Sequence, residues 1–166
     1  SNLERLLYHL SGEDCGALRE WMTGLKTERR YAVPAAVREQ LDARFAAGSA
    51  TDAQVAETIR RVFEEKHYLC DTHTAVAVRV YEEYRARTGD TVPTVIASTA
   101  SPYKFAPAIL SALGEKVAQR PYDLLTALHE RTGVPVPQPL ETLRNKTVRF
   151  TDTCAGDTAG MRQTVC

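Results

Sequence analysis

The chain has 166 residues, with 21 basic and 21 acidic side chains, so its formal net charge is zero. Hydrophobic residues make up 43% and charged residues 25%, which is ordinary for a globular chain of one domain. The balanced charge argues against nucleic acid or an anionic membrane surface as a partner. The apolar runs are only a few residues long, which argues against a membrane-spanning helix.

The cysteines indicate neither a disulfide framework nor a metal site. None of them forms a C-x-x-C pair, and reduced thiols in a cytoplasmic protein are the simpler interpretation. Cys70 and His73 have C-x-x-H spacing, but a zinc site needs about four ligands and no second pair is visible, so no metal is predicted. The four cysteines are Cys15, Cys70, Cys154 and Cys166.

About eight helices are expected along the chain. Apolar residues recur at helical spacing after each helix start. Thr51 and Gln54 form a capping box, and Asp71 is a natural N-cap for a helix rich in Ala and Val. Such a helix is normally buried by its neighbours. The other expected helices begin near Leu3, Asp14, Pro34, Ser101, Pro121 and Leu140.

One β-strand is predicted at 92–97, a short apolar run rich in β-branched residues. It ends at the hydroxyls of Ser98 and Thr99. Ser101 and Pro102 then predict the N-cap and first residue of a helix that ends at Gly114. In α/β proteins, such a strand-to-helix edge is where ligands bind. The alternative is a buried strand followed by a well-capped helix without a ligand.

The predicted fold class is therefore mainly α with one short strand, the helices being packed around a strand–turn–helix at 92–114. We expect a single helical domain at 1–150 and a polar tail at 151–166. A single buried strand cannot satisfy its own backbone groups. The chain is accordingly expected to be part of a larger α/β protein whose upstream part supplies partner strands.

Two side chains near the strand allow both a plain and a functional interpretation. His73, in the first turn of its helix, is more often a capping or core residue than a reactive one. Lys104 lies in the first turn of the next helix, where the helix dipole disfavours a cation. It hints at an anionic partner, although a simply exposed side chain is as good an explanation.

Two segments resemble the C-terminal third of threonine synthase, of the longer bacterial and fungal type. They are Tyr68-Leu-Cys-Asp-Thr-His-Thr-Ala-Val76 and Ser98-Thr-Ala-Ser-Pro-Tyr-Lys-Phe105. The start of the chain at 1–7 is similar to that family too, as are the segment Pro137-Gln-Pro-Leu140 and the tail Val148-Arg-Phe150 with Cys154.

The resemblance implies a pyridoxal-phosphate enzyme of the tryptophan-synthase-β-like fold (fold type II). It implies conversion of O-phospho-L-homoserine and water to L-threonine and phosphate. A hydroxyl of the pair Ser98 and Thr99, most simply Thr99, is implied to meet the ring nitrogen of the cofactor. Lys104, Ser101, Asp71 and His73 are expected to lie around the same active site.

The family's Schiff-base lysine belongs to a Ser-x-Lys-Asp motif, which does not occur here, and neither does its glycine-rich phosphate loop. No catalytic residue is therefore assigned to this chain. Both motifs are expected upstream, in the N-terminal part of the same enzyme, so that the chain alone is expected to be inactive and to bind no cofactor. The alternative is a stand-alone helical interaction domain that has kept the family's shape without its chemistry.

Overall fold

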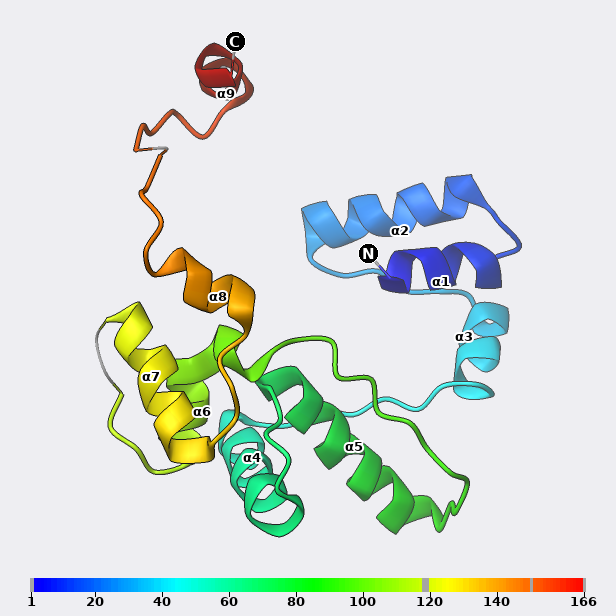
Figure 1. The fold of residues 1–166 in the computed structure, drawn as a ribbon. Coiled ribbons are helices and arrows are strands. Elements are labelled where there is room, and N and C mark those ends of the chain that lie inside the picture. Colours follow the sequence, from blue (N-terminus) through cyan, green and yellow to red (C-terminus); the bar gives the residue numbers. More distant parts are fainter. Residues whose placement is uncertain (1, 118–119, 150, 166) are drawn as a thin grey trace. The chain divides into compact units, whose positions relative to one another are not determined.

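The computed structural model describes residues 2–117, 120–149 and 151–165, and every regular element in these ranges is helical (Figure 1). The described residues divide into two compact units. One comprises 1–50 with 80–93, and the other comprises 51–79 with 94–166. In the described part of the chain, no helix is both long enough and apolar enough to cross a membrane.

The first unit contains three helices and the end of a fourth. Its small core consists of Leu7, Trp21 and Val37, with partly buried apolar neighbours around them. The side-chain amide of Gln40 donates to the carbonyl of Leu10 at 3.2 Å, which ties the third helix to the first. The helices are α1 (Asn2–Leu10), α2 (Cys15–Glu28) and α3 (Ala35–Asp42), followed by the last turns of α5 (Thr72–Thr88).

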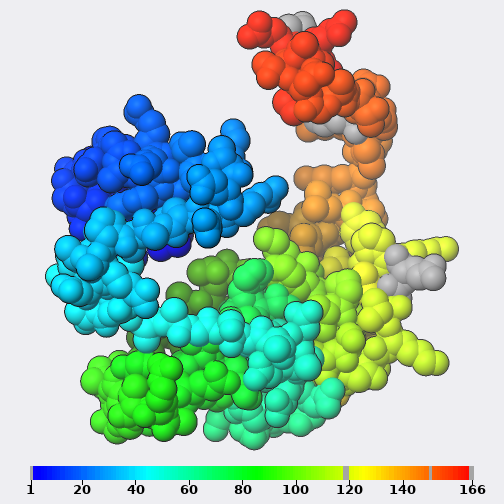
Figure 2. Space-filling model, turned by 180° about the vertical axis from the view of Figure 1, so that it is seen from behind, coloured from blue at the N-terminus to red at the C-terminus, as the bar shows by residue number. Residues whose placement is uncertain are grey.

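The second unit holds the larger core. Ile59, Ile109, Leu110 and Leu128 are almost completely buried there. Figure 2 shows the blue-green atoms of α4 (Asp52–Lys66) against the yellow-green atoms of α6 (Ala106–Ala112). A hydrogen bond also joins these two helices, because the guanidinium of Arg60 donates to the carbonyl of Ala112 at 2.8 Å. The elements are α4 (Asp52–Lys66), the start of α5, the 3₁₀ helix η1 (Pro102–Phe105), α6 (Ala106–Ala112), α7 (Pro121–Thr132), α8 (Gln138–Leu143) and α9 (Thr158–Val165).

The expected helix starts are largely confirmed. Thr51 and Gln54 form the full capping box of α4, and the Ser101 hydroxyl accepts from the backbone N–H of Tyr103 at the start of η1. α7 begins at Pro121, and Gly133 directly after its last residue adopts the left-handed conformation, as a C-terminal glycine allows. The predicted polar tail contains the helix α9, while the boundary at residue 150 and Cys166 lie outside the described residues.

The predicted strand at 92–97 is wrong. No described residue is in a strand, and this segment connects α5 to η1 without regular structure. The segment is also not buried, since Val92 is 66% exposed and Val95 is 95% exposed. A strand forms only by pairing with a neighbour. A β-branched run with no strand beside it among the described residues therefore forms no strand.

Candidate functional site

The first turn of α5 is organised by a buried carboxylate. Asp71 is fully buried, and its Oδ1 accepts from the backbone N–H groups of His73 at 2.9 Å and Thr74 at 3.4 Å. These are two of the N–H groups that lack a partner within the helix itself. Asp71 thus caps α5, as the sequence predicts, and its second oxygen remains available for a further donor.

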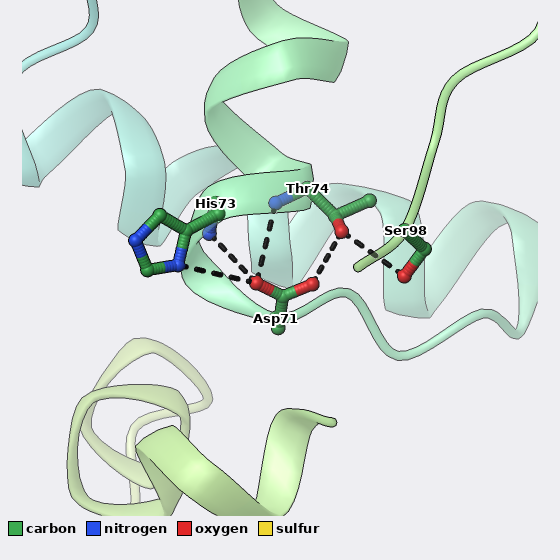
Figure 3. A network of polar contacts seen from close by, with 4 residues as sticks. All are labelled: Asp71, His73, Thr74 and Ser98. Atoms are coloured by element: carbon green, nitrogen blue, oxygen red, sulfur yellow. Dashed lines mark hydrogen bonds and ion pairs between the residues drawn. The ribbon is translucent and has the colours of Figure 1, made fainter. Parts of the chain in front are cut away.

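The second oxygen of Asp71 connects α5 to the segment that leads into η1. The hydroxyl of Thr74 donates to Asp71 Oδ2, and its oxygen lies 3.1 Å from the hydroxyl oxygen of Ser98 (Figure 3). Thr74 is itself buried. Three polar groups from two distant parts of the sequence therefore form one contiguous cluster, Asp71–Thr74–Ser98.

These contacts keep Asp71 ionised. Burial raises the pKa of the Asp71 carboxyl, but the hydrogen bonds from the Thr74 hydroxyl and from the two backbone N–H groups oppose it, as does the nearby His73. The net result is a pKa below the ordinary aspartate value, because hydrogen bonds to the charged form favour that form. The neighbouring thiol responds in the opposite way. Burial first, and the charge of Asp71 second, raise the pKa of Cys70 to about 11 against a smaller opposing effect of Arg61.

His73 points to the other side of Asp71 from Ser98 (Figure 3). Its Nδ1 lies 3.5 Å from Asp71 Oδ1, while its side chain is 70% exposed. Its ring packs against the ring of Phe105 with 5.0 Å between the centroids. The Nζ of Lys104 lies 5.4 Å from the centre of the same Phe105 ring. The start of α5 and η1 therefore lie next to each other, with a histidine and a lysine on one aromatic ring.

A pocket of about 730 Å³ opens beside η1. This volume lies within the range of small-molecule and cofactor sites, which are mostly apolar with a few polar groups. Thr99, Ser101 and Lys104 contribute its polar side chains close to η1. Its apolar lining comes from α6, α7 and α8 and their flanks, and includes Pro107, Leu124, Leu125, Pro137, Leu140 and Leu143.

One wall of this pocket is held in place by Tyr103. The side chain of Tyr103 is buried, and its hydroxyl donates to the carbonyl of Val134 at 2.5 Å. Burial raises the pKa of the Tyr103 hydroxyl, so the group stays a neutral donor. The bond joins η1 to the segment between α7 and α8.

The six side chains predicted around a site fall into two groups. Ser98, Asp71 and His73 belong to the cluster at the start of α5, whereas Thr99, Ser101 and Lys104 line the pocket. Thr74, which connects the first group, was missed by the sequence reasoning. Its position three residues after a predicted N-cap was the available signal, because the side chain at that position can reach back to the cap.

The described residues contain no group of three or more His, Cys, Asp or Glu side chains arranged to hold a metal ion. The polar groups that are present are hydroxyls, one carboxylate, one imidazole and one ammonium group. They can donate and accept hydrogen bonds and hold an anionic or heterocyclic ligand in place.

Residues 74–165, more than half of the chain, match the family described as "Threonine synthase, C-terminal". The chain is 34% identical to threonine synthase of Saccharomyces cerevisiae, an alignment that covers 68% of this chain and 25% of that protein. It is 33% identical to human threonine synthase-like 1, over 68% of this chain and 15% of that protein.

Two crystal structures of threonine synthases are similar to the chain. The yeast structure has a TM-score of 0.74 at 26% identity, covering 99% of this chain and 33% of that one. The pyridoxal-phosphate-bound structure from Brucella melitensis has a TM-score of 0.61 at 35% identity, covering 75% of this chain and 26% of that one.

The chain therefore belongs to the threonine synthase C-terminal family. It spans about a quarter of the length of the curated yeast relative and a third or less of the two solved chains. The family relationship extends to the threonine synthase-like proteins as well as to threonine synthases.

Proposed function

We propose that the chain forms the C-terminal part of a threonine synthase, which converts O-phospho-L-homoserine and water to L-threonine and phosphate with pyridoxal phosphate as cofactor. The observation that carries the proposal is the cluster Asp71–Thr74–Ser98. It holds Ser98 in place, and the next residue, Thr99, lines a pocket of cofactor size. The similarity to a threonine synthase solved with pyridoxal phosphate supports the same assignment.

The residues present suit one side of such a cofactor. A hydroxyl can donate to an uncharged ring nitrogen without adding a charge, and Thr99 supplies a hydroxyl in the pocket, next in the chain to Ser98 of the cluster. The bound cofactor supplies the electron sink for reactions at the substrate's carbon atoms. The mostly apolar lining next to Thr99 would keep water from the ring.

The other predicted side chains have supporting roles in this proposal. Ser101 caps η1 and so fixes the turn after Thr99. The side chains of Lys104 and His73 both lie against the ring of Phe105. Both can face an anionic group such as the phosphate of the substrate. Asp71 holds the start of α5 and lies 3.5 Å from the His73 ring. The catalytic lysine and the cofactor's phosphate-binding loop would be supplied by the N-terminal part of the same enzyme.

The test is expression of the complete gene product that contains this chain, followed by two measurements. Its absorption spectrum should show bound pyridoxal phosphate, and it should release phosphate and threonine from O-phospho-L-homoserine. Residues 1–166 alone should do neither under the same conditions. A complete gene product that binds the cofactor but forms no threonine would indicate a different reaction, whereas a product that binds none would favour the stand-alone interaction domain.

A further inference from the structure

The backbone carbonyl of Val134 is in contact with two side chains that can donate to it. The hydroxyl of Tyr103 in η1 donates to its oxygen at 2.5 Å. Nδ1 of His129, in the last turn of α7, lies 2.8 Å from the same oxygen. A carbonyl oxygen has two lone pairs, so two donors use its full accepting capacity. This one atom therefore joins η1 and α7 to the segment that leads into α8.

The contact determines which nitrogen of His129 carries a hydrogen. A carbonyl oxygen accepts and never donates, so the contact is a hydrogen bond only if Nδ1 donates. In neutral His129 the hydrogen therefore lies on Nδ1 and the lone pair on Nε2, because the bond that one ring nitrogen makes selects the tautomer. In an imidazolium both nitrogens carry a hydrogen. His129 is thus a donor to Val134 in both charge states.

The rest of the Val134 backbone is fixed as well. Its N–H donates to the hydroxyl oxygen of Thr132 at 3.3 Å, and that hydroxyl donates its own hydrogen to a carbonyl one turn earlier in α7. Gly133 adopts the left-handed conformation, and its N–H donates to the backbone carbonyl of His129 at 2.8 Å. The side chain of Val134 packs against the larger core. The start of the segment between α7 and α8 therefore has a defined position.

The segment that begins at Val134 forms part of the pocket lining. Pro137 and Leu140 line the pocket a few residues further along the chain. Tyr103 and its neighbour Lys104 line the same pocket from η1. The hydrogen bonds to the Val134 carbonyl therefore hold two parts of the lining at a fixed separation, and the pocket volume of about 730 Å³ depends on that separation.

The far end of α8 has a weaker attachment. Arg144 follows α8, and its Nη2 donates to the hydroxyl of Thr126 in α7 at 3.2 Å. Its guanidinium also lies 5.3 Å from the centre of the Tyr122 ring. Exposed contacts of a long charged side chain contribute little to stability, whereas the Tyr103 side chain is buried. Of these two attachments, the one at the Val134 carbonyl is therefore the stronger.

We propose that His129 is a positioning residue that shares the Val134 carbonyl with Tyr103 and so fixes the part of the pocket lining at Pro137 and Leu140. Either donor alone keeps the carbonyl paired, and the loss of both leaves it without a side-chain donor. The lining then moves and the pocket loses its defined width. The proposal rests on the proposed function only for the ligand that fills the pocket, pyridoxal phosphate.

The position of the hydrogen is tested first, in residues 1–166. The measurement is the ¹⁵N NMR spectrum of the imidazole groups at about pH 9, where an ordinary imidazole is neutral. We expect the hydrogen of His129 on Nδ1. A hydrogen on Nε2 would mean that His129 does not donate to Val134, and it overturns the proposal.

The second measurement is amide hydrogen exchange in the same chain. The N–H of Leu140 donates to the carbonyl of Pro137 at 2.9 Å and reports on the lining, while the N–H of Leu113 in the α6 C-cap is the reference. The double variant of Tyr103→Phe and His129→Ala should speed exchange at Leu140 more than at Leu113. Each single variant should change it much less, because one donor remains. Equal acceleration at both amides would indicate a general loss of stability and overturns the proposal.

The third measurement is the dissociation constant of pyridoxal phosphate in the complete gene product. The same double variant should raise it on the order of tenfold. His129→Asn in the Tyr103→Phe background should recover most of the affinity, because the amide places an N–H group close to the position of Nδ1. His9→Ala, at an exposed position of the first unit, is the control for the loss of an imidazole.

A double variant that binds the cofactor as tightly as the wild type overturns the positioning role of His129. Failure of His129→Asn to recover affinity overturns it too, because the restored donor would then have no effect. A wild-type gene product that binds no cofactor contradicts the proposed function instead. In that case the tautomer and the exchange at Leu140 still decide whether His129 holds the lining.

Discussion

Asp71 and His73 lie 3.5 Å apart, from Oδ1 to Nδ1, yet the carboxylate is completely buried and the imidazole side chain is 70% exposed. The contact therefore connects the interior of the second unit to its surface. The buried member of the pair is stabilised in its charged form by hydrogen bonds, and this has a direct consequence for stability in acid.

Acid should destabilise the chain partly through Asp71. Its pKa in the fold is below the value of about 3.9 for an unfolded aspartate. The charged form therefore contributes stability above that unfolded value, and the contribution is lost as the pH falls toward the folded pKa. We expect the urea midpoint of the wild type to fall more between pH 7 and pH 3 than that of Asp71→Asn, which cannot titrate here. Equal losses in the two proteins would contradict this role.

The hydrogen bond between Tyr103 and Val134 should contribute measurably to stability. Removing the hydroxyl with Tyr103→Phe leaves the ring in place but leaves the carbonyl of Val134 without this donor. We expect a loss of about 0.5–1.5 kcal/mol in the free energy of unfolding. The control is Tyr68→Phe, since Tyr68 is 49% exposed and should change by much less. The prediction fails if the two variants are equally stable.

The cysteines should differ sharply in reactivity. Cys70 is buried and its pKa is raised to about 11, so little thiolate forms at pH 8. Cys15 and Cys154 are exposed. Brief treatment with iodoacetamide and peptide mass spectrometry should find Cys15 and Cys154 labelled and Cys70 unlabelled. In about 6 M urea, a concentration that unfolds most small proteins, the thiol of Cys70 becomes exposed and should be labelled as well. Labelling of Cys70 before unfolding would contradict the burial of its thiol.

The parts of the fold that depend on local sequence could be predicted from it. Thr51, Asp71 and Ser101 were identified as caps because a cap needs only a side chain and the next three residues. The segment around Val95 was mistaken for a strand because its β-branched residues favour strand structure. A strand also needs a second strand to pair with, and local sequence does not reveal whether one is present.

The candidate site was predicted only in part, because local patterns can be recognised in the sequence and contacts between distant residues cannot. Ser98, Thr99 and Lys104 were found because they flank a predictable helix start, and the family resemblance directed attention to Asp71 and His73. The contact between Thr74 and Ser98 joins residues 24 positions apart in the sequence, so no local pattern reveals it. The helix α9 was missed because the polar sequence near Thr158 has no strong apolar periodicity.

The proposed function requires that this chain supplies the hydroxyl that meets the cofactor in a threonine synthase. It is tested most directly by Thr99→Val in the complete gene product, with Thr91→Val as a control of the same chemical change at an exposed position outside the pocket. The measurement is the rate of phosphate release from O-phospho-L-homoserine, with the urea midpoint as a check of the fold. We expect a turnover at least about tenfold slower for Thr99→Val, equivalent to about 1.4 kcal/mol in the barrier. The urea midpoint should be unchanged, and Thr91→Val should have a normal rate. Wild-type turnover in Thr99→Val would contradict it.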